Sequence, residues 1–513
     1  MPTAPANGSK RGPEAAHQAI AKFIESSKDP VLLEPGEKQF ALSSDSLHIE
    51  FANGKLTLQA WDRDRNIVRR VLAVTEEKPG NLELEIERFG KRAGTLRLFD
   101  LAKPQNQSVF RKGSRLTFRE QFRRSLSRQY PGWEIAELTS EADLQHSLSP
   151  SFPRALLRKG GAGLAAIGAP SGANADGVLT FGLIWLDYLL HRERRLRIES
   201  LSLILPLGQE RTTCLRLRHL DRTGMNFTVF VYSEQGHEER ADLKDYGNVD
   251  TRLSPRRTEL HGDRAASQHD EWVARLLASG PVEAVERGDG TMSLRVRGLE
   301  FAVRTPDGLR FGLETKRAAR ASHLPEMEAI VREIARLRSA ESPDRQNPIY
   351  SRNPELWMES QVRSSLEVLD ASLRFHPVYG QVPAFAGVER GVIDLLACDT
   401  RGRLAVLELK AEEDVHLPLQ ALDYWIRVNW HLSRGEFLRH GYFAGIELRS
   451  EAPRLLLIAP SLNFHPTTET ILGFFGDAIE IERIGLGMDW QQRLQVMFRL
   501  AGSSRPLYQR GTI

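Results

Sequence analysis

Residues 391–411 read GVIDLLACDTRGRLAVLELKA, and this stretch decides the fold expected for the last third of the chain. Two apolar runs flank Asp399-Thr400-Arg401-Gly402, whose residue types are typical of a tight turn. The stretch therefore predicts a β-hairpin centred on Arg401. In that register residue 398 pairs with 404, residue 396 with 406, and residue 394 with 408.

Three charged residues fall on one patch of this hairpin. Asp394 and Glu408 lie opposite each other, with Cβ atoms roughly 4.5–5.5 Å apart. Lys410 points to the same face as Glu408, because side chains alternate along a strand. Two adjacent carboxylates repel each other and raise a carboxyl pKa, and a divalent cation relieves that repulsion. The pattern predicts a site for Mg²⁺ (or Mn²⁺) held by Asp394 and Glu408.

Such a site is suited to phosphodiester hydrolysis. A bound cation activates water and stabilises the charge that develops on the phosphate. Lys410 could orient that water or neutralise the transition state. The catalytic residues expected are therefore Asp394, Glu408 and Lys410.

Helices on either side are expected to add side chains to the site. Upstream, PELWMESQVRSSLEVLDASL (354–373) places Glu359 on an apolar face, where an acid needs a partner, so we expect it to join the hairpin acids. Glu355 is the alternative helix acid, although a solvated first-turn role is favoured for it. Downstream, Gln420 and Tyr424 are four residues apart on one helix face and could contact substrate or brace the metal ligands.

Together, Asp394, the triplet Glu408-Leu409-Lys410, and Gln420 with Tyr424 resemble the PD-(D/E)XK nuclease superfamily, in its RecB-like branch with a Q-x3-Y helix motif. The string IDLLACDTRGRLAVLELK is similar to NucS-type members, which cut branched or mismatched DNA. The resemblance covers about 350–490. Ile393 precedes the aspartate where the motif's name has proline, which is common in the superfamily.

The resemblance implies a restriction-endonuclease-like αβββαβ core. RLLLIAPSL (454–462) would form its fourth strand and AIEIERIG (478–485) a later one. It also implies Asp394 and Glu408 as metal ligands, Lys410 as catalytic, and Glu359 as the helix acid.

The remaining chain is too long for one hydrophobic core, so we expect a multidomain α/β protein. Alternating segments over 38–101, with turns at Asn53-Gly54 and Pro79-Gly80, predict an antiparallel sheet. The predicted domains are a disordered tail (1–12), a β-rich domain with a leading helix (13–105), a mixed α/β domain with a basic helix (106–255), an α-βββ-α unit (268–340) and the nuclease-like domain (350–513).

The α-βββ-α unit contains GLEFAVRTPDGLRFGLETK (298–316), which also carries "PD" and "ETK". A two-residue turn at Pro306-Asp307 would separate Asp307 from Glu314 by roughly 20 Å. An unrelated meander is therefore favoured, and a degenerate duplicate of the nuclease core stays open.

A basic segment, FRKGSRLTFREQFRRSLSRQYPGW (110–133), predicts a helix at about 114–129. The helix could bind phosphates through Arg119, Arg123 and Arg124. The aromatic side chains available to stack on bases are Phe118, Phe122 and Trp133. The alternative, which is favoured, is an amphipathic helix whose arginines are solvated and whose inward-packing residues are Leu116, Phe118, Phe122 and Leu126.

Composition narrows the class of protein. The chain is 41% hydrophobic and 27% charged, as in a globular protein, and its net charge of +3 does not by itself indicate nucleic-acid binding. Cys214 and Cys398 lie far apart in apolar runs, which excludes a disulfide framework and fits a cytoplasmic location. The apolar stretch 178–190 is short and contains Asp187, so we expect a buried element and no membrane partner.

We therefore expect a metal-dependent endonuclease acting on DNA, branched or single-stranded. A catalytically inactive nuclease-fold scaffold or nucleic-acid-binding interaction protein is the alternative, and an RNA nuclease is a weaker one. A homodimer, or a helicase or repair partner, stays open.

Overall fold

A computed structural model of the chain describes residues 11–34, 40–42, 46–61, 66–88, 92–171, 175–221, 224–233, 236–245, 251–255, 268–287, 290–386 and 389–502. The predicted disordered tail (1–12) lies outside the described residues, apart from Arg11 and Gly12. As predicted, the described chain is mixed α/β with several sheets. It divides into two compact units: unit 1 comprises Met1–Val178, Leu189–Pro206 and Tyr232–Gly236, and unit 2 comprises Leu179–Tyr188, Leu207–Val231 and His237–Ile513.

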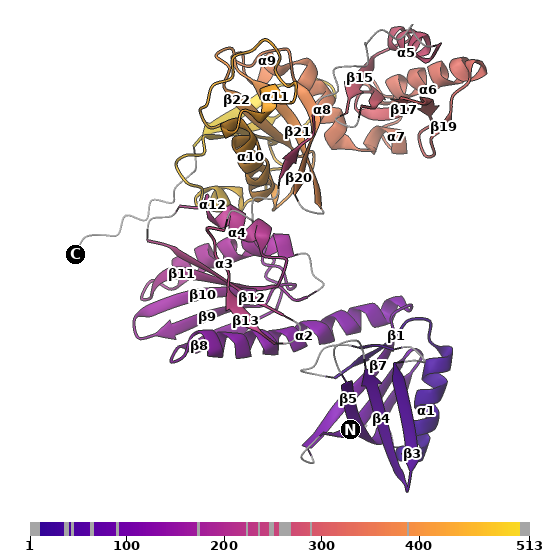
Figure 1. Ribbon diagram of the computed structural model, residues 1–513, viewed down its shortest axis with the longest axis vertical. Helices are drawn as coiled ribbons and strands as arrows, with labels where there is room; N and C mark the ends of the chain where they lie inside the picture. Colours follow the sequence, from indigo (N-terminus) through magenta and orange to yellow (C-terminus); the bar gives the residue numbers. More distant parts are fainter. Residues whose placement is uncertain are drawn as a thin grey trace, which may run out of the picture. The chain divides into compact units, whose positions relative to one another are not determined.

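Unit 1 begins with helix α1 (Pro13–Ser26) and a seven-stranded antiparallel sheet (Figure 1). The predicted turn at Asn53-Gly54 is confirmed, because Ala52 pairs with Lys55 and both turn residues have positive φ. One face of the sheet packs against the buried side of α1. In sheet order the strands are β2 (Phe40–Ala41), β1 (Pro30–Leu33), β7 (Arg92–Asp100), β6 (Asn81–Arg88), β5 (Asn66–Lys78), β4 (Lys55–Trp61) and β3 (Leu47–Ala52).

A long helix, α2 (Pro104–Gln129), follows in unit 1. It begins earlier than the predicted 114, because Pro104 fits the first turn of a helix. Beyond it lie four neighbouring strands, with β10 and β11 parallel and the other pairs antiparallel. In sheet order they are β11 (Arg197–Pro206), β10 (Ala162–Gly168), β9 (Arg154–Lys159) and β8 (Glu134–Thr139).

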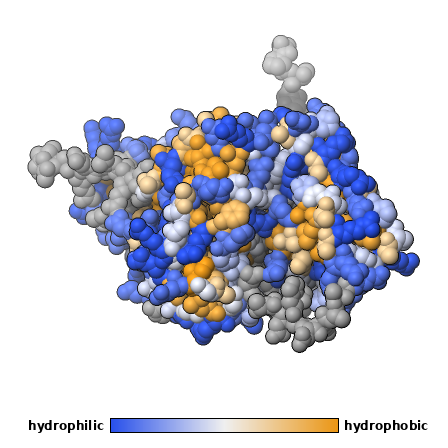
Figure 2. All heavy atoms as spheres, turned by 90° about the horizontal axis from the view of Figure 1, so that it is seen from above, coloured by the Kyte–Doolittle hydropathy of each residue, from blue (hydrophilic) through white to orange (hydrophobic). Residues whose placement is uncertain are grey.

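The apolar stretch near 178–190 forms helix α3 (Val178–Arg192), most of whose apolar residues are buried, as expected. No helix among the described residues is long and apolar enough to cross a membrane. On the face that Figure 2 shows, hydrophobic residues form separate patches with hydrophilic residues between them. Shorter elements follow α3 in the chain: α4 (Arg211–Leu217), β12 (Asn226–Tyr232), β13 (Glu238–Arg240) and β14 (Arg252–Leu253).

Residues 268–338 of unit 2 form what we call the meander module. It is an antiparallel five-stranded meander whose core includes apolar residues of two helices, α5 (Gln268–Ala278) and α6 (Leu324–Leu337). The predicted two-residue turn is confirmed, since Thr305 pairs with Gly308. The strands are β15 (Val282–Glu286), β16 (Met292–Val296), β17 (Leu299–Thr305), β18 (Gly308–Phe311) and β19 (Arg317–Ala318).

The last part of unit 2 is built on a seven-stranded sheet in the order β14-β20-β21-β22-β23-β24-β25. Strands β22, β23 and β24 run parallel, and the other neighbours are antiparallel. The strands are β20 (Tyr379–Ala386), β21 (Glu389–Cys398), β22 (Leu404–Leu409), β23 (Arg454–Pro460), β24 (Ile481–Leu486) and β25 (Val496–Ala501). The helices are α7 (Pro348–Ser351), α8 (Pro354–Ser364), α9 (Leu366–Leu369), α10 (Leu417–Ser433), α11 (Glu436–Arg439) and α12 (Thr468–Leu472).

Helix α8 packs on one face of this sheet. Its Trp357, Met358 and Val362 share a core with residues 395, 397, 405, 407 and 409 of the hairpin. Because side chains alternate along a strand, residues 394, 396, 406 and 408 belong to the opposite face. Helix α10 lies against β22 and β23, and its Tyr424 is close enough to Glu408 to feel its charge. The two helices therefore sandwich the hairpin.

Candidate functional site

The hairpin has the predicted register. Cys398 pairs with Leu404 and Leu396 pairs with Val406. The turn is held by the Asp399 carboxylate, which accepts hydrogen bonds from the backbone N–H groups of Arg401 (2.8 Å) and Arg403 (2.9 Å). The residue types of the turn and the alternation of side chains along each strand were therefore enough to predict that residue 394 lies beside residue 408.

Asp394 and Glu408 meet on the buried hairpin. Their carboxyl groups share a hydrogen bond, and Asp394 Oδ2 also accepts a hydrogen bond of 2.9 Å from the backbone N–H of Leu409. Glu408 is 1% exposed, and its Oε2 has no hydrogen-bond partner within the described part of the chain. The site thus holds a buried oxygen whose hydrogen-bonding capacity is unused, an arrangement that a cation would satisfy.

Burial governs the charge of this pair. Loss of solvation raises the pKa of Asp394 to about 6, although the Leu409 N–H and the Lys410 ammonium pull it down. Burial, together with the charge of Asp394, raises the pKa of Glu408 well above its usual value. The pair therefore holds a proton at pH values where exposed carboxyls have lost theirs, and Glu408 donates it to Asp394.

Lys410 lies among acids. Its Nζ is 3.6 Å from Asp414 Oδ2, 3.7 Å from Glu355 Oε1 and 4.0 Å from Glu408 Oε1. Burial lowers the pKa of Lys410, but the surrounding carboxylates outweigh burial and the pKa lies above its usual value. Lys410 is therefore a cation at neutral pH and cannot act there as a general base.

The acid that α8 brings to Lys410 is Glu355, whereas Glu359 was expected. Glu359 is 1% exposed and pairs with Arg295 (3.6 Å) and Arg363 (3.9 Å). The helix packs on the hairpin face opposite to Glu408, so its middle is separated from the acids by the sheet. Its first turn reaches past the end of β22, and Glu355 meets Lys410 there.

Gln420 and Tyr424 lie on α10 as one pair. Gln420 Nε2 donates a hydrogen bond of 3.3 Å to the Tyr424 hydroxyl. Burial, followed by the charge of Glu408, raises the pKa of Tyr424 above its usual value. The neutral hydroxyl remains a hydrogen-bond donor near the acid pair, which fits a bracing role better than a chemical one.

Asp414 also lies beside Lys410, and it was not among the predicted site residues. It lies in the loop between β22 and α10, where its Oδ1 accepts a hydrogen bond of 2.8 Å from the backbone N–H of His416. The available signal was its spacing of four residues from Lys410 in a short loop. For Glu355, the alternative helix acid, the informative feature is its position in the first turn of α8.

The basic helix belongs to unit 1, whereas the acids belong to unit 2. Phe118, Phe122 and Leu126 are buried, and Phe122 packs against Gly168, so the favoured amphipathic alternative is confirmed for them and they cannot stack on bases. Leu116, which was also expected to pack inward, is 43% exposed. Arg123 and Arg124 are exposed, with Arg123 paired to Glu120 at 3.0 Å. Arg119 is partly buried. The two exposed arginines are available for phosphates.

The second acid-and-lysine pattern does not form a comparable site. Lys316 approaches Glu300 (3.4 Å), but Glu314 is 82% exposed and pairs with Arg352. Asp307 lies in the turn between β17 and β18. The acids of this pattern are therefore spread along the meander.

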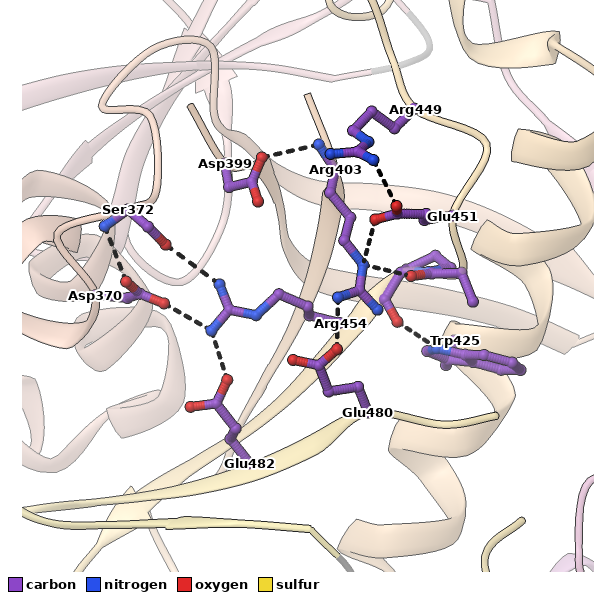
Figure 3. A network of polar contacts seen from close by, with 12 residues as sticks. Asp370, Ser372, Asp399, Arg403, Trp425, Arg449, Glu451, Arg454, Glu480 and Glu482 are labelled. Carbon is purple, nitrogen blue, oxygen red and sulfur yellow. Dashed lines mark hydrogen bonds and ion pairs between the residues drawn. The ribbon is translucent and has the colours of Figure 1, made fainter. Parts of the chain in front are cut away.

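A second charged cluster of the sheet lies at the opposite ends of β22 and β23, and Figure 3 shows its geometry. Arg454 stands between Asp370 and Glu482, and Arg403 reaches Glu480. Each acid there faces an arginine, so the charges compensate one another and the cluster is structural. The pair of acids at Asp394 and Glu408 differs, because two carboxyl groups lie side by side and burial raises the pKa of both.

The donor set around the acid pair is small. Among the described residues no group of three or more His, Cys, Asp or Glu side chains is arranged to hold a metal ion. Asp394 and Glu408 supply two carboxylates, which is the number Mg²⁺ commonly uses when water and substrate phosphate complete its shell.

Comparison with protein-family models, with curated proteins and with solved structures finds no match to this chain.

Proposed function

We propose that the chain is a metal-dependent nuclease that hydrolyses phosphodiester bonds of DNA, with Mg²⁺ or Mn²⁺ held by Asp394 and Glu408. One observation carries the proposal: two carboxyl groups lie side by side on facing strands, Glu408 is buried, and its Oε2 has no hydrogen-bond partner among the described residues. A cation that replaces the proton retained by Glu408 would interact favourably with both carboxylates. The chain order α8-α9-β20-β21-β22-α10-α11-β23 supports the proposal, because apart from the one-turn helices α9 and α11 it follows the αβββαβ order of the core that the sequence resembles.

A divalent cation at this position supplies Lewis-acid stabilisation of the charge that develops on the phosphate. The protein's own groups do the rest. Lys410 remains an ammonium ion, so it can donate hydrogen bonds to a phosphate oxygen or to the attacking water. Glu355 and Asp414 hold Lys410 in place from two sides. Gln420 and Tyr424 brace the acid pair from α10.

Cleavage by the purified chain tests the proposal. Single-stranded, duplex and branched DNA would be incubated with Mg²⁺ or Mn²⁺, and products separated on denaturing gels. We expect cutting that needs the metal and that is abolished by Glu408→Ala and by Lys410→Ala. Glu480→Gln is the matched control, because Glu480 belongs to the compensated cluster of the same sheet and is half-exposed.

The second candidate is a catalytically inactive scaffold of the same fold. The lack of a third acidic or imidazole ligand among the described residues favours it. DNA binding without metal dependence, and without cutting, would establish the scaffold. RNA substrates in the same assay separate an RNA nuclease from a DNA nuclease.

A further inference from the structure

The meander module contacts the backbone of helix α8. Gly298, in the β16–β17 turn, has a φ of +78°, and a Cβ added to it would lie 2.0 Å from the backbone oxygen of Leu356. Only glycine combines this backbone conformation with so close an approach. The turn is therefore built to meet the first half of the helix.

A buried arginine makes a second contact with the same helix. Arg338 follows α6 directly, is fully buried, and places its guanidinium 4.6 Å from the ring centroid of Trp357. It also donates a hydrogen bond of 3.4 Å to the backbone oxygen of Asn353. A desolvated cation over an indole ring is a favourable pairing, so the module holds α8 by side chain as well as by backbone.

A charged cluster fixes the next turn of the helix. Arg295 of β16 lies 3.6 Å from Glu359, and both side chains are almost completely buried. Glu283 of β15 pairs with Arg363 and accepts a hydrogen bond from Ser360. Since a buried charge tolerates the loss of its partner poorly, these pairs set the rotation of α8 about its axis.

The rotation of α8 decides where Glu355 lies. Glu355 and Glu359 are four residues apart and share a helix face. With Glu359 fixed on Arg295, Glu355 extends past the end of β22, and its Oε1 lies 3.7 Å from Lys410 Nζ. A chain of contacts thus runs from β16 through one helical turn to the candidate site.

We propose that the meander module is the positioning element of the candidate site, and that Arg295 acts through Glu359 to hold Glu355 beside Lys410. Arg295 touches none of the reacting groups, so it is a positioning residue. The inference rests on the proposed function, because only that function makes Lys410 part of an active site. The contacts between the module and α8 do not depend on catalysis.

Zero-length crosslinking of the full chain measures this position directly. A carbodiimide joins an amine to a carboxyl group only when the two touch. Lys410 Nζ lies 3.7 Å from Glu355 and 3.6 Å from Asp414, and Asp414 lies outside α8. The ratio of the Lys410–Glu355 product to the Lys410–Asp414 product, read by peptide mass spectrometry, therefore reports the position of α8. Changes in the reactivity of Lys410 cancel in this ratio.

We expect Arg295→Gln to lower the ratio severalfold and Arg295→Lys, which keeps the charge, to restore most of it. Arg310→Gln is the matched control, because Arg310 is an exposed arginine of the same module that donates to the backbone oxygen of Lys316. Should Arg295→Gln fail to fold, Glu283→Gln tests the hold of the module on α8 through Arg363 and Ser360, at a position whose side chain is 26% exposed.

The outcomes separate the two proposals. An unchanged ratio in folded Arg295→Gln and Glu283→Gln, or no Lys410–Glu355 product in the parent chain, overturns the positioning role even if DNA is cut. A fall in the ratio in a chain that cuts no DNA refutes the nuclease and leaves the positioning role standing. If both hold, Arg295→Gln should lower kcat with little change in KM, because Glu355 adjoins the reacting centre.

Discussion

Asp394 lies beside the buried Glu408, and the loss of solvation that raises its own pKa makes the folded state sensitive to pH. The pKa of Asp394 is raised from 3.8 to about 6, so the folded chain keeps a proton that the unfolded chain has lost. The stability that this proton contributes is complete below pH 3.8 and is lost as the pH rises through about 6. In the absence of metal, neutral pH therefore destabilises the hairpin.

Asp394→Asn should remove this dependence. The asparagine cannot ionise and still accepts a hydrogen bond, so between pH 4 and pH 8 the parent chain should lose about 3 kcal/mol more stability than the variant. Hydrogen exchange of the β21 and β22 amides, measured without divalent cations, reports the local free energy of opening.

The control for this prediction is an acid whose pKa moves the other way. Burial raises the pKa of Asp370, but hydrogen bonds from Ser372 and Arg454 more than offset it, so its pKa lies below the usual value. Asp370→Asn should therefore cost stability at neutral pH and little at low pH. Equal pH slopes for the parent chain and Asp394→Asn would show that Asp394 titrates normally.

At the scale of elements, the hairpin was predictable because local chemistry determines it. Asp399 and Gly402 fix the turn, and the period of two then sets which residues face each other. The face of the sheet on which α8 packs is not encoded in that pattern. The spacing of apolar residues in α8 therefore predicts which side of the helix is buried. It does not predict whether Glu355 or Glu359, which lie one turn apart on that side, reaches the candidate site.

The turn offers a test of how strongly the hairpin is constrained. Gly402 has a φ of +87°, and a Cβ added to it would lie 2.1 Å from the backbone oxygen of Glu447. Gly435 has a φ of +62° with nothing within 4 Å. Gly435→Ala should cost about 1 kcal/mol from backbone strain alone. Gly402→Ala should cost roughly 1–3 kcal/mol more, because overpacking adds to that strain.

Exchange of the β21 and β22 amides in the two variants measures the difference. The Gly402 variant should loosen this hairpin, whereas the Gly435 variant should affect the junction of α10 and α11. If both substitutions change the exchange rates by similar, small amounts, the loop that carries Glu447 moves aside at little cost in free energy.

At the scale of the whole molecule, the basic helix and the acid pair belong to different units, so the sequence could not relate them. Binding by α2 has to rely on charge, because Phe118 and Phe122 are buried and cannot stack on bases. The proposed function then implies a division of labour, in which exposed arginines of unit 1 attract the phosphate backbone while unit 2 performs the chemistry. Contacts to phosphates carry no sequence information, so this attraction would be independent of sequence.

Joint replacement of Arg123 and Arg124 by Gln tests this division. If each arginine contacts one phosphate, the slope of log affinity against log salt should fall by about two, and KM should rise at unchanged kcat. The matched control replaces Arg336 and Arg439, which are exposed arginines of unit 2, and removes the same total charge. An equal loss of affinity in both double variants would show that only net charge matters. No loss in the Arg123 and Arg124 variant would mean that these arginines are merely solvated, and DNA would then have to be bound elsewhere.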